Sequence, residues 1–292
     1  MNRLVFAGCS FTHSGESWAY QPQPKNKPHV EWIEQPGGDW GNHLLREQSE
    51  WIEKVYGIKN VFDPATFWKN SHSLPEEQYE INIFGRGSNS NTDTARCIMH
   101  FIENYEHDID TVVMQISGFA RRELFTSSPE AMEHANTFSG YDMNVTTYDD
   151  ANFIKHHGCI DLNEVKNEEP KDALRTASAR FYSVVESEEY HIRAIEQLQS
   201  LTNFCKVNNI KLAYFHGWDN IPEDTTEYFN KKYNKYVKPY LLSQDSIISY
   251  AQTHLEEKFV YDIMTHNGEH GGHPCPLAHQ LYWNDIVYPF VK

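Results

Sequence analysis

The chain has 292 residues, and its 25 Lys and Arg stand against 41 Asp and Glu, which gives a formal net charge of −16. A phosphate backbone or an anionic membrane surface repels such a charge, so we expect neither a nucleic acid nor a membrane as a partner. No apolar run approaches the roughly 20 residues that span a bilayer, and no export-signal pattern opens the chain. These features predict a cytoplasmic protein.

Cysteine usage argues against two further classes of protein. The number of cysteines is odd, and none of them has C-x-x-C spacing, so neither a disulfide framework nor a thiolate zinc site is predicted. We therefore expect reduced thiols and no cofactor. The cysteines are Cys9, Cys97, Cys159, Cys205 and Cys275.

The first predicted strand covers residues 3–7 and ends at Gly8, and Ser10 follows after one further residue. In an open parallel sheet, ligand crevices form beyond the carboxyl ends of the strands, so a hydroxyl at this point faces a substrate. Ser10 is therefore a candidate nucleophile. The ordinary alternative is a serine that caps a helix.

Four more strands are predicted, each an apolar or alternating run that ends in polar or glycine-containing sequence. They cover residues 79–84, 111–117, 210–216 and 258–263. Helical patterns occupy 40–56, 95–105, 179–208, 225–240 and 243–255, and a last helix begins near Pro276. Strands and helices in this order predict an α/β fold, a three-layer αβα sandwich around a parallel sheet of roughly five strands.

Three stretches lack a sustained hydrophobic period, at about 13–40, 60–78 and 124–178. We expect them to be irregular insertions in a single domain that covers residues 1–292. Long insertions of this kind often border a binding site.

The turn after the second strand, residues 85–93, is rich in Gly, Ser and Asn. A phosphate-binding loop is one interpretation of such a turn. Neither G-x-x-x-x-G-K-[ST] nor a complete G-x-G-x-x-G is present, so no nucleotide is predicted.

Residues 266–279 contain four histidines, which is compatible with a metal site built from His266, His270 and His273. The glycines and prolines among them predict a loop, however, and no H-E-x-x-H helix is present, so no metal is predicted. The alternative is that one of these histidines activates Ser10, because a serine hydroxyl is a poor nucleophile until an imidazole takes its proton.

Gly8–Thr12, the Gly/Asn turn after the second strand, and His273–Pro274 ahead of a last helix that carries His279 together resemble the SGNH (GDSL-type) hydrolases. The resemblance implies a flavodoxin-like fold and ester hydrolysis, with Ser10 as nucleophile and His273 as general base. In the second block it implies an oxyanion donor from a glycine backbone. Gly87 matches best there, and Gly85 is the alternative.

The same block of the family commonly carries an asparagine, for which Asn89 and Asn91 are the candidates. The structural alternatives are a turn role for Gly87 and a helix-capping role for Asn89. Both roles are compatible with catalysis.

The third block departs from the family pattern, which is usually Gly-x-Asn-Asp, because Gly118–Arg121 follows the third strand here. Gln115, Ser117 or one of the second-block asparagines could replace the missing donor. Gln115, Ser117 and Arg122–Glu123 also resemble a variant of this block in viral and environmental members. Our candidate substrate-binding residues are therefore Gln115, Ser117, Arg121 and Arg122.

His270 stands where the family places the aspartate that orients the base. An imidazole cannot orient His273 as a carboxylate would, so Glu269, a backbone carbonyl or a Ser-His dyad are the alternatives.

These observations predict an esterase that removes an acetyl or other short acyl group from a carbohydrate or small metabolite. Aromatic residues, 14 percent of the chain, suit a sugar ligand, and they suit loops anchored to a core equally well. The rival is a catalytically degenerate carbohydrate-binding or structural module on the same fold. Nothing in the sequence indicates the oligomeric state.

Overall fold

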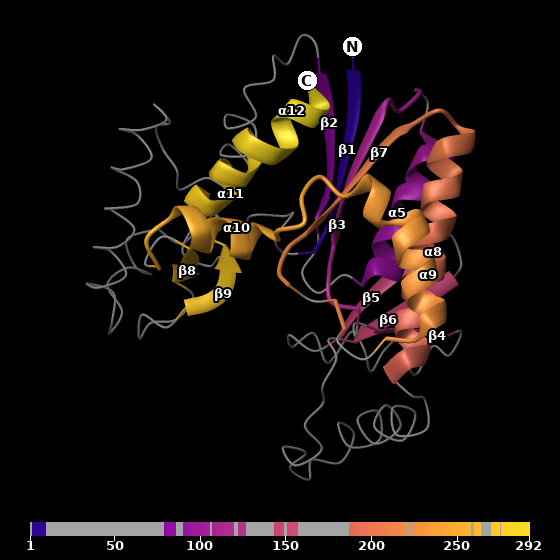
Figure 1. Cartoon of the computed structure of the whole chain (residues 1–292). Coiled ribbons are helices and arrows are strands. Elements are labelled where there is room, and N and C mark those ends of the chain that lie inside the picture. Colours follow the sequence, from indigo (N-terminus) through magenta and orange to yellow (C-terminus); the bar gives the residue numbers. More distant parts are fainter. Residues whose placement is uncertain are drawn as a thin grey trace, which may run out of the picture.

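A parallel sheet lies at the centre of the molecule, with helices on both of its faces (Figure 1). Its strand order is β2-β1-β3-β7, and every neighbouring pair is parallel. The strands are β1 (Asn2–Gly8), β2 (Tyr79–Gly85), β3 (Thr111–Ile116) and β7 (Lys211–His216). The predicted α/β class with a parallel sheet is confirmed.

The computed structural model describes most of the sheet, the helices that follow β2, and parts of the loops between them. The described residues are 2–9, 79–85, 90–105, 107–119, 122–126, 143–148, 151–156, 187–219, 221–222, 225–257, 260–263, 270–274 and 276–292. The predicted helix at 40–56 and the predicted insertions at 13–40 and 60–78 lie outside them.

Burial on both faces explains why the central strands are almost entirely apolar. All six residues of β3 are buried, and β1 is buried from Leu4 to its end. Successive side chains point to opposite faces, so Leu4 and Val113 join one core cluster while Val5 and Val112 join the other. Alternate side chains of each central strand therefore belong to different core clusters, one on each face of the sheet.

One helical layer contains α5 (Asn91–Asn104), α8 (Ser187–Val207) and α9 (Glu227–Tyr236), followed by the 3-10 turn η1 (Lys238–Tyr240). The opposite layer contains α10 (Ile247–His254), α11 (Pro276–Tyr282), the π-helical turn η3 (Trp283–Val287) and α12 (Tyr288–Val291). Figure 1 shows the two layers on either side of the strands. Within the described helices, none is long and apolar enough to cross a membrane.

Side-chain caps explain where several helices begin. Ser90, Thr226 and Ser246 each accept a backbone N–H three residues further on, at 3.0, 3.2 and 3.0 Å. At the other end of α8, Asn209 has a φ of 56°, and the N–H of Ile210 reaches back to the carbonyl of Cys205 at 2.8 Å. This Schellman-type end stops the helix just before β7.

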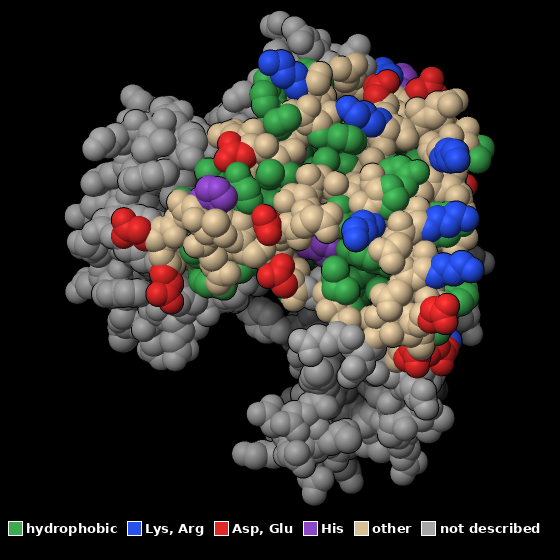
Figure 2. Space-filling model, in the orientation of Figure 1, with side chains coloured by type: hydrophobic (Ala, Val, Ile, Leu, Met, Phe, Trp, Pro, Cys, Tyr) green, Lys and Arg blue, Asp and Glu red, His purple; other side chains and the backbone are tan. Residues whose placement is uncertain are grey.

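Two lysines of α9 have their ammonium groups near aromatic rings. The ammonium of Lys232 is 4.8 Å from the centre of the Tyr228 ring, and that of Lys235 is 4.9 Å from the centre of the Tyr236 ring. Figure 2 shows basic side chains along this side of the molecule, beside apolar ones. The two ammonium groups thus lie near aromatic faces, where cation–π attraction adds a modest stabilisation.

The predicted fifth strand does not join the parallel sheet in the described part of the chain. β8 (Tyr261–Ile263) instead pairs antiparallel with β9 (His270–Pro274). Val260, just before β8, is buried among the helices of the α10 layer, so the apolar run serves that core. An apolar run specifies burial without specifying the partner strand.

The expected irregular insertion at 124–178 contains regular structure, so that expectation is wrong for its strands. β4 (Arg122–Thr126), β6 (Ala151–His156) and β5 (Met143–Tyr148) form an antiparallel sheet in the order β4-β6-β5. Tyr148 pairs with Ala151, so only residues 149–150 connect β5 to β6. Such short strands are easily missed, because their Thr and Asn residues hide the hydrophobic alternation.

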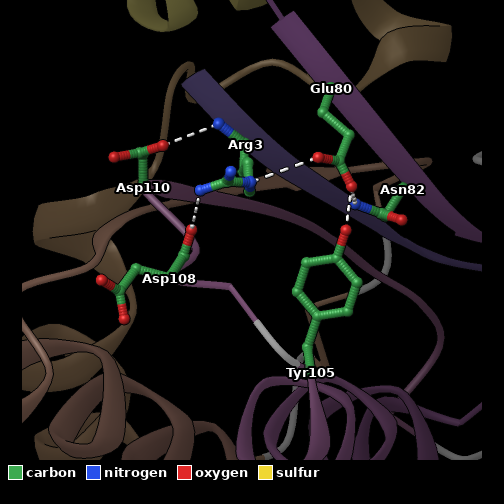
Figure 3. A network of polar contacts seen from close by, with 6 residues as sticks. All are labelled: Arg3, Glu80, Asn82, Tyr105, Asp108 and Asp110. Carbon is green, nitrogen blue, oxygen red and sulfur yellow. Dashed lines mark hydrogen bonds and ion pairs between the residues drawn. The ribbon is translucent and has the colours of Figure 1, made fainter. Parts of the chain in front are cut away.

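A polar network joins the amino ends of the first strands (Figure 3). The backbone N–H of Arg3 donates to the Asp110 carboxylate at 2.7 Å, and its guanidinium donates to Glu80 at 3.2 Å. The Tyr105 hydroxyl donates to the same Glu80 carboxylate. This hydrogen bond, and the nearby Arg3 charge, lower the pKa of Glu80 below its usual 4.5.

The Glu80 network predicts an acid-sensitive contribution to stability. A lowered folded-state pKa means that ionised Glu80 stabilises the fold above pH 4.5, and that this contribution is lost as pH falls through the folded-state pKa. Glu80→Gln should lower the unfolding temperature at pH 7 by about 1–3 °C. It should also lose less stability than the wild type below pH 4.5.

Thermal unfolding from pH 7 down into acid checks this prediction. The matched control is Glu257→Gln, which changes an exposed glutamate between α10 and β8. Parallel acid curves for wild type and Glu80→Gln would contradict it.

The left-handed residue that ends α8 makes a second prediction. A side chain other than Asn or Gly is strained at positive φ, so Asn209→Ala should lower the free energy of unfolding by about 1 kcal/mol. Asn209→Gly should change it by less than about 0.5 kcal/mol, because glycine has no Cβ to clash. Urea unfolding of the three proteins measures both, and equal losses in the two variants would refute the role of the backbone angle.

Candidate active site

The strand order places a topological switch point between β1 and β3. The chain leaves β1 for β2 on one side, and it leaves β3 for β7 on the other. Open α/β sheets form ligand crevices at the carboxyl ends of the strands where the order reverses in this way. The residues that follow β1 and β3 therefore border the place where this sheet is expected to bind a ligand.

The pairing of β1 with β3 ends before either strand ends. The last paired residues are Ala7 and Met114, whereas β1 continues beside β2 to the pair of Gly8 with Gly85. On its other side, β3 continues beside β7 to the pair of Ile116 with His216. β1 and β3 therefore separate after Ala7 and Met114, while each continues beside its outer neighbour.

A glutamine side chain fills the opening between these strands. The backbone N–H of Cys9 donates to Gln115 Oε1 at 3.3 Å, and Gln115 Nε2 donates to Cys9 Sγ at 3.0 Å. Gln115 is 0 percent exposed. The carboxamide must turn its oxygen toward the Cys9 amide, because two N–H groups cannot bond each other. This contact fixes the residue immediately before Ser10.

A second buried amide joins the end of β3 to the start of α5. Asn91 Oδ1 accepts the Ser117 N–H at 2.7 Å and the Ser117 hydroxyl at 3.2 Å. Asn91 Nδ2 donates to the Ser117 carbonyl at 3.0 Å. Both residues are only 1 percent exposed. The loop after β3 is therefore held against the helix that follows β2.

These contacts show where several predicted site residues lie. Gln115, Ser117 and Asn91 come together at the carboxyl edge of the sheet, as expected for residues that follow β2 and β3. Each is buried and engaged in the contacts above. Any role in binding substrate or in catalysis stays a prediction.

Other predicted residues fall on the backbone of described strands or outside the described part of the chain. Gly85 is the last residue of β2, Arg122 is the first of β4, and His270 and His273 belong to β9. The N-cap of α5 is Ser90, so the alternative in which Asn89 caps a helix is wrong. The predicted residues outside the described part are Ser10, Gly87, Asn89, Arg121 and Glu269.

β9 carries the candidate base and runs directly into α11. Its register pairs His270 with Ile263 and Pro274 with Tyr261. The strand contacts α10 and α11, and Pro274 is buried. The described backbone therefore holds His273 on the α10 side of the sheet, and its pairing with Ser10 stays a prediction.

Two polar residues at the end of β7 were not singled out from the sequence. The buried His216 Nε2 shares a hydrogen bond of 2.8 Å with the Tyr233 hydroxyl of α9, and burial raises the pKa of Tyr233 to about 12. Asp219 is exposed and accepts a hydrogen bond from Ser249 of α10 at 3.3 Å. A polar residue just beyond the apolar run of a predicted parallel strand is the signal that could have found them.

The described residues contain no group of three or more His, Cys, Asp or Glu that could hold a metal ion. In the metal interpretation from the sequence, His266 lies outside the described residues, and only the backbone of His270 and His273 is described. Burial raises the pKa of the Cys205 thiol to about 12.

No protein-family model and no curated protein matches the sequence. Among solved structures, the chain is similar to the psychrotrophic esterase EstA from Pseudoalteromonas sp., in a structure inhibited by monoethylphosphonate. The alignment covers 100 percent of this chain and 97 percent of that chain, with 12 percent sequence identity and a TM-score of 0.38. A likeness at this level establishes neither the fold nor the function of the present chain.

The Asn91–Ser117 contact makes a stability prediction. Asn91→Ala removes the acceptor of a buried backbone N–H, so it should lower the free energy of unfolding by about 1–3 kcal/mol. Ser117→Ala removes only the hydroxyl contact and keeps both backbone contacts, so its loss should be smaller, about 0.5–1.5 kcal/mol. Urea unfolding measures both, and a larger loss in Ser117→Ala would overturn the ranking.

Proposed function

We propose that the chain is a serine ester hydrolase of the SGNH type, with Ser10 as nucleophile and His273 as general base. The observation that carries the proposal is the position of β1. Its carboxyl end borders the topological switch point, and Ser10 follows two residues after Gly8. A hydroxyl there enters the crevice that α/β sheets use for ligands.

In the proposed mechanism, Ser10 Oγ attacks the ester carbonyl while His273 takes the hydroxyl proton. The carbonyl oxygen becomes an oxyanion, which the backbone N–H groups of Ser10 and Gly87 stabilise. His273 then gives the proton to the departing alcohol, and an acyl-enzyme forms. Water attacks this ester with His273 again as base, which releases the acid and restores Ser10.

The register of the first two strands supports this pair of oxyanion donors. Gly8 and Gly85 are paired residues, so the turns that carry Ser10 and Gly87 start at the same level of the sheet. Each donor comes two residues after its glycine. A common starting level favours the convergence of two backbone donors on one oxyanion.

The proposed substrates are esters with an acetyl or other short acyl group on a carbohydrate or small metabolite. Support comes from the sequence resemblance and from the aromatic content of the chain, since Trp and Tyr offer an apolar face and a polar edge to a sugar ring. His270 stands in place of the usual acid, so the proposed centre works as a Ser-His dyad or is oriented by Glu269.

The mechanism predicts the behaviour of two variants toward a fluorophosphonate probe and short-chain nitrophenyl esters. The wild type should be labelled at serine, whereas Ser10→Ala should not be labelled. Ester hydrolysis should fall at least about 1,000-fold in Ser10→Ala and in His273→Ala. Ser200→Ala, which changes a serine on the exposed side of α8, is the matched control and should behave as the wild type.

Folded wild-type protein that takes no label would refute the hydrolase and favour the rival binding module. Binding of acetylated sugars by that protein, measured calorimetrically, would identify the rival directly. Loss of hydrolysis after exhaustive chelation would instead favour metal-assisted chemistry through the histidine segment.

A further inference from the structure

We infer that Gln115 is a positioning residue for the nucleophile: its carboxamide replaces the strand partner that β1 loses at Cys9, and it thereby fixes the backbone from which Ser10 projects. This inference rests on the proposed function and deepens it. It assigns Gln115 a role through Cys9, in place of direct contact with the substrate.

The backbone of β1 needs a new hydrogen-bond acceptor after Ala7. Inside the ladder, the strand N–H groups bond to neighbouring strands, but the pairing with β3 stops at Ala7 and Met114. Cys9 lies beyond this point and is fully buried. A buried N–H without an acceptor costs about 1–3 kcal/mol, so β1 could not leave β3 here unless another acceptor were present. Gln115 Oε1 supplies it at 3.3 Å.

Position 115 is fully buried, yet it carries a polar amide. Val113, two residues earlier on the same face of β3, belongs to the apolar cluster that also contains Phe6 and Cys9. A leucine or methionine would fill the position of Gln115 without the desolvation penalty of a buried amide. Glutamine has what these residues lack, an acceptor for the Cys9 N–H and a donor that reaches Cys9 Sγ at 3.0 Å.

The contact at Cys9 also acts on the peptide unit that carries the Ser10 N–H. The carbonyl carbon of Cys9 is bonded to the nitrogen of Ser10, the proposed oxyanion donor, so an anchored Cys9 restricts rotation of that peptide unit. The Ser10 N–H and hydroxyl must both keep their direction while the ester reacts. A displacement of about 1 Å at a reacting group costs about 100-fold in rate.

Gln115 is poorly placed to act on substrate itself. Its side chain is 0 percent exposed, and both ends of the carboxamide are engaged with Cys9. In the proposed arrangement, the oxyanion donors are backbone N–H groups. Gln115 acts on one of these donors, the Ser10 N–H, through its contact with Cys9.

The test compares Gln115→Met with Cys9→Ala. Gln115→Met keeps the approximate volume and removes the acceptor, so kcat for a nitrophenyl ester and the rate of fluorophosphonate labelling should fall about 100-fold, with KM changed little. Cys9→Ala removes the sulfur but keeps the backbone N–H and its bond to Gln115. It should retain most of the wild-type kcat.

Gln115→Glu provides a rescue. A protonated carboxyl group is neutral and accepts the Cys9 N–H as the amide does, whereas a carboxylate is costly to bury at this position and draws the side chain toward water. The activity of Gln115→Glu relative to the wild type at the same pH should therefore rise as pH falls. A purely structural role for Gln115 gives no such pH profile in protein that is folded throughout the range.

Hydrogen exchange of the Cys9 amide gives a readout that does not depend on activity. It should be at least about 10-fold faster in Gln115→Met than in the wild type, under conditions where global unfolding is negligible. Unchanged exchange, an unchanged kcat in Gln115→Met, or equal loss of kcat in Gln115→Met and Cys9→Ala would overturn the inference. A wild type inert to the probe refutes the proposed hydrolase, and the exchange rates still decide whether Gln115 anchors Cys9.

Discussion

The early parting of β1 from β3 is the constraint on which the rest of the site depends. A parallel strand that stays in its ladder has its backbone groups bonded to neighbouring strands, so its backbone N–H groups do not bond a ligand. Here β1 loses β3 as a partner after Ala7, and the Gln115 side chain accepts the buried N–H of Cys9, two residues further on. The Cys9 N–H therefore keeps an acceptor where β1 and β3 separate.

Side chains accept backbone N–H groups at both ends of the sheet, but charged groups do so at the amino end and neutral amides at the carboxyl end. At the amino end, Arg3, Glu80 and Asp110 are partly or fully exposed, so charged groups can bond there while water still solvates them. At the carboxyl end, Gln115 and Asn91 are buried. Burial disfavours charge, so neutral amides, which donate and accept at once, are the groups that fit.

The two amides also join segments that are far apart in the sequence. Gln115 links β3 to Cys9 across 106 residues, and Asn91 links the start of α5 to Ser117 across 26. The two contacts thereby tie the end of β1 to β3, and the residue after β3 to the start of α5. In the proposed mechanism the nucleophile follows Cys9 directly, so the contact with Gln115 positions its backbone before any substrate arrives.

The sequence by itself determined the elements whose pattern is local. Strands β1, β2, β3 and β7 follow from apolar or alternating runs, and the end of α8 follows from Asn208 and Asn209, because burial and turn chemistry depend on neighbouring residues. Only the tertiary structure decided that β8 pairs with β9, and that Gln115 bonds Cys9. The physical reason is that a hydrogen bond between distant segments leaves no periodic trace in either of them, since each segment is already compatible with several partners.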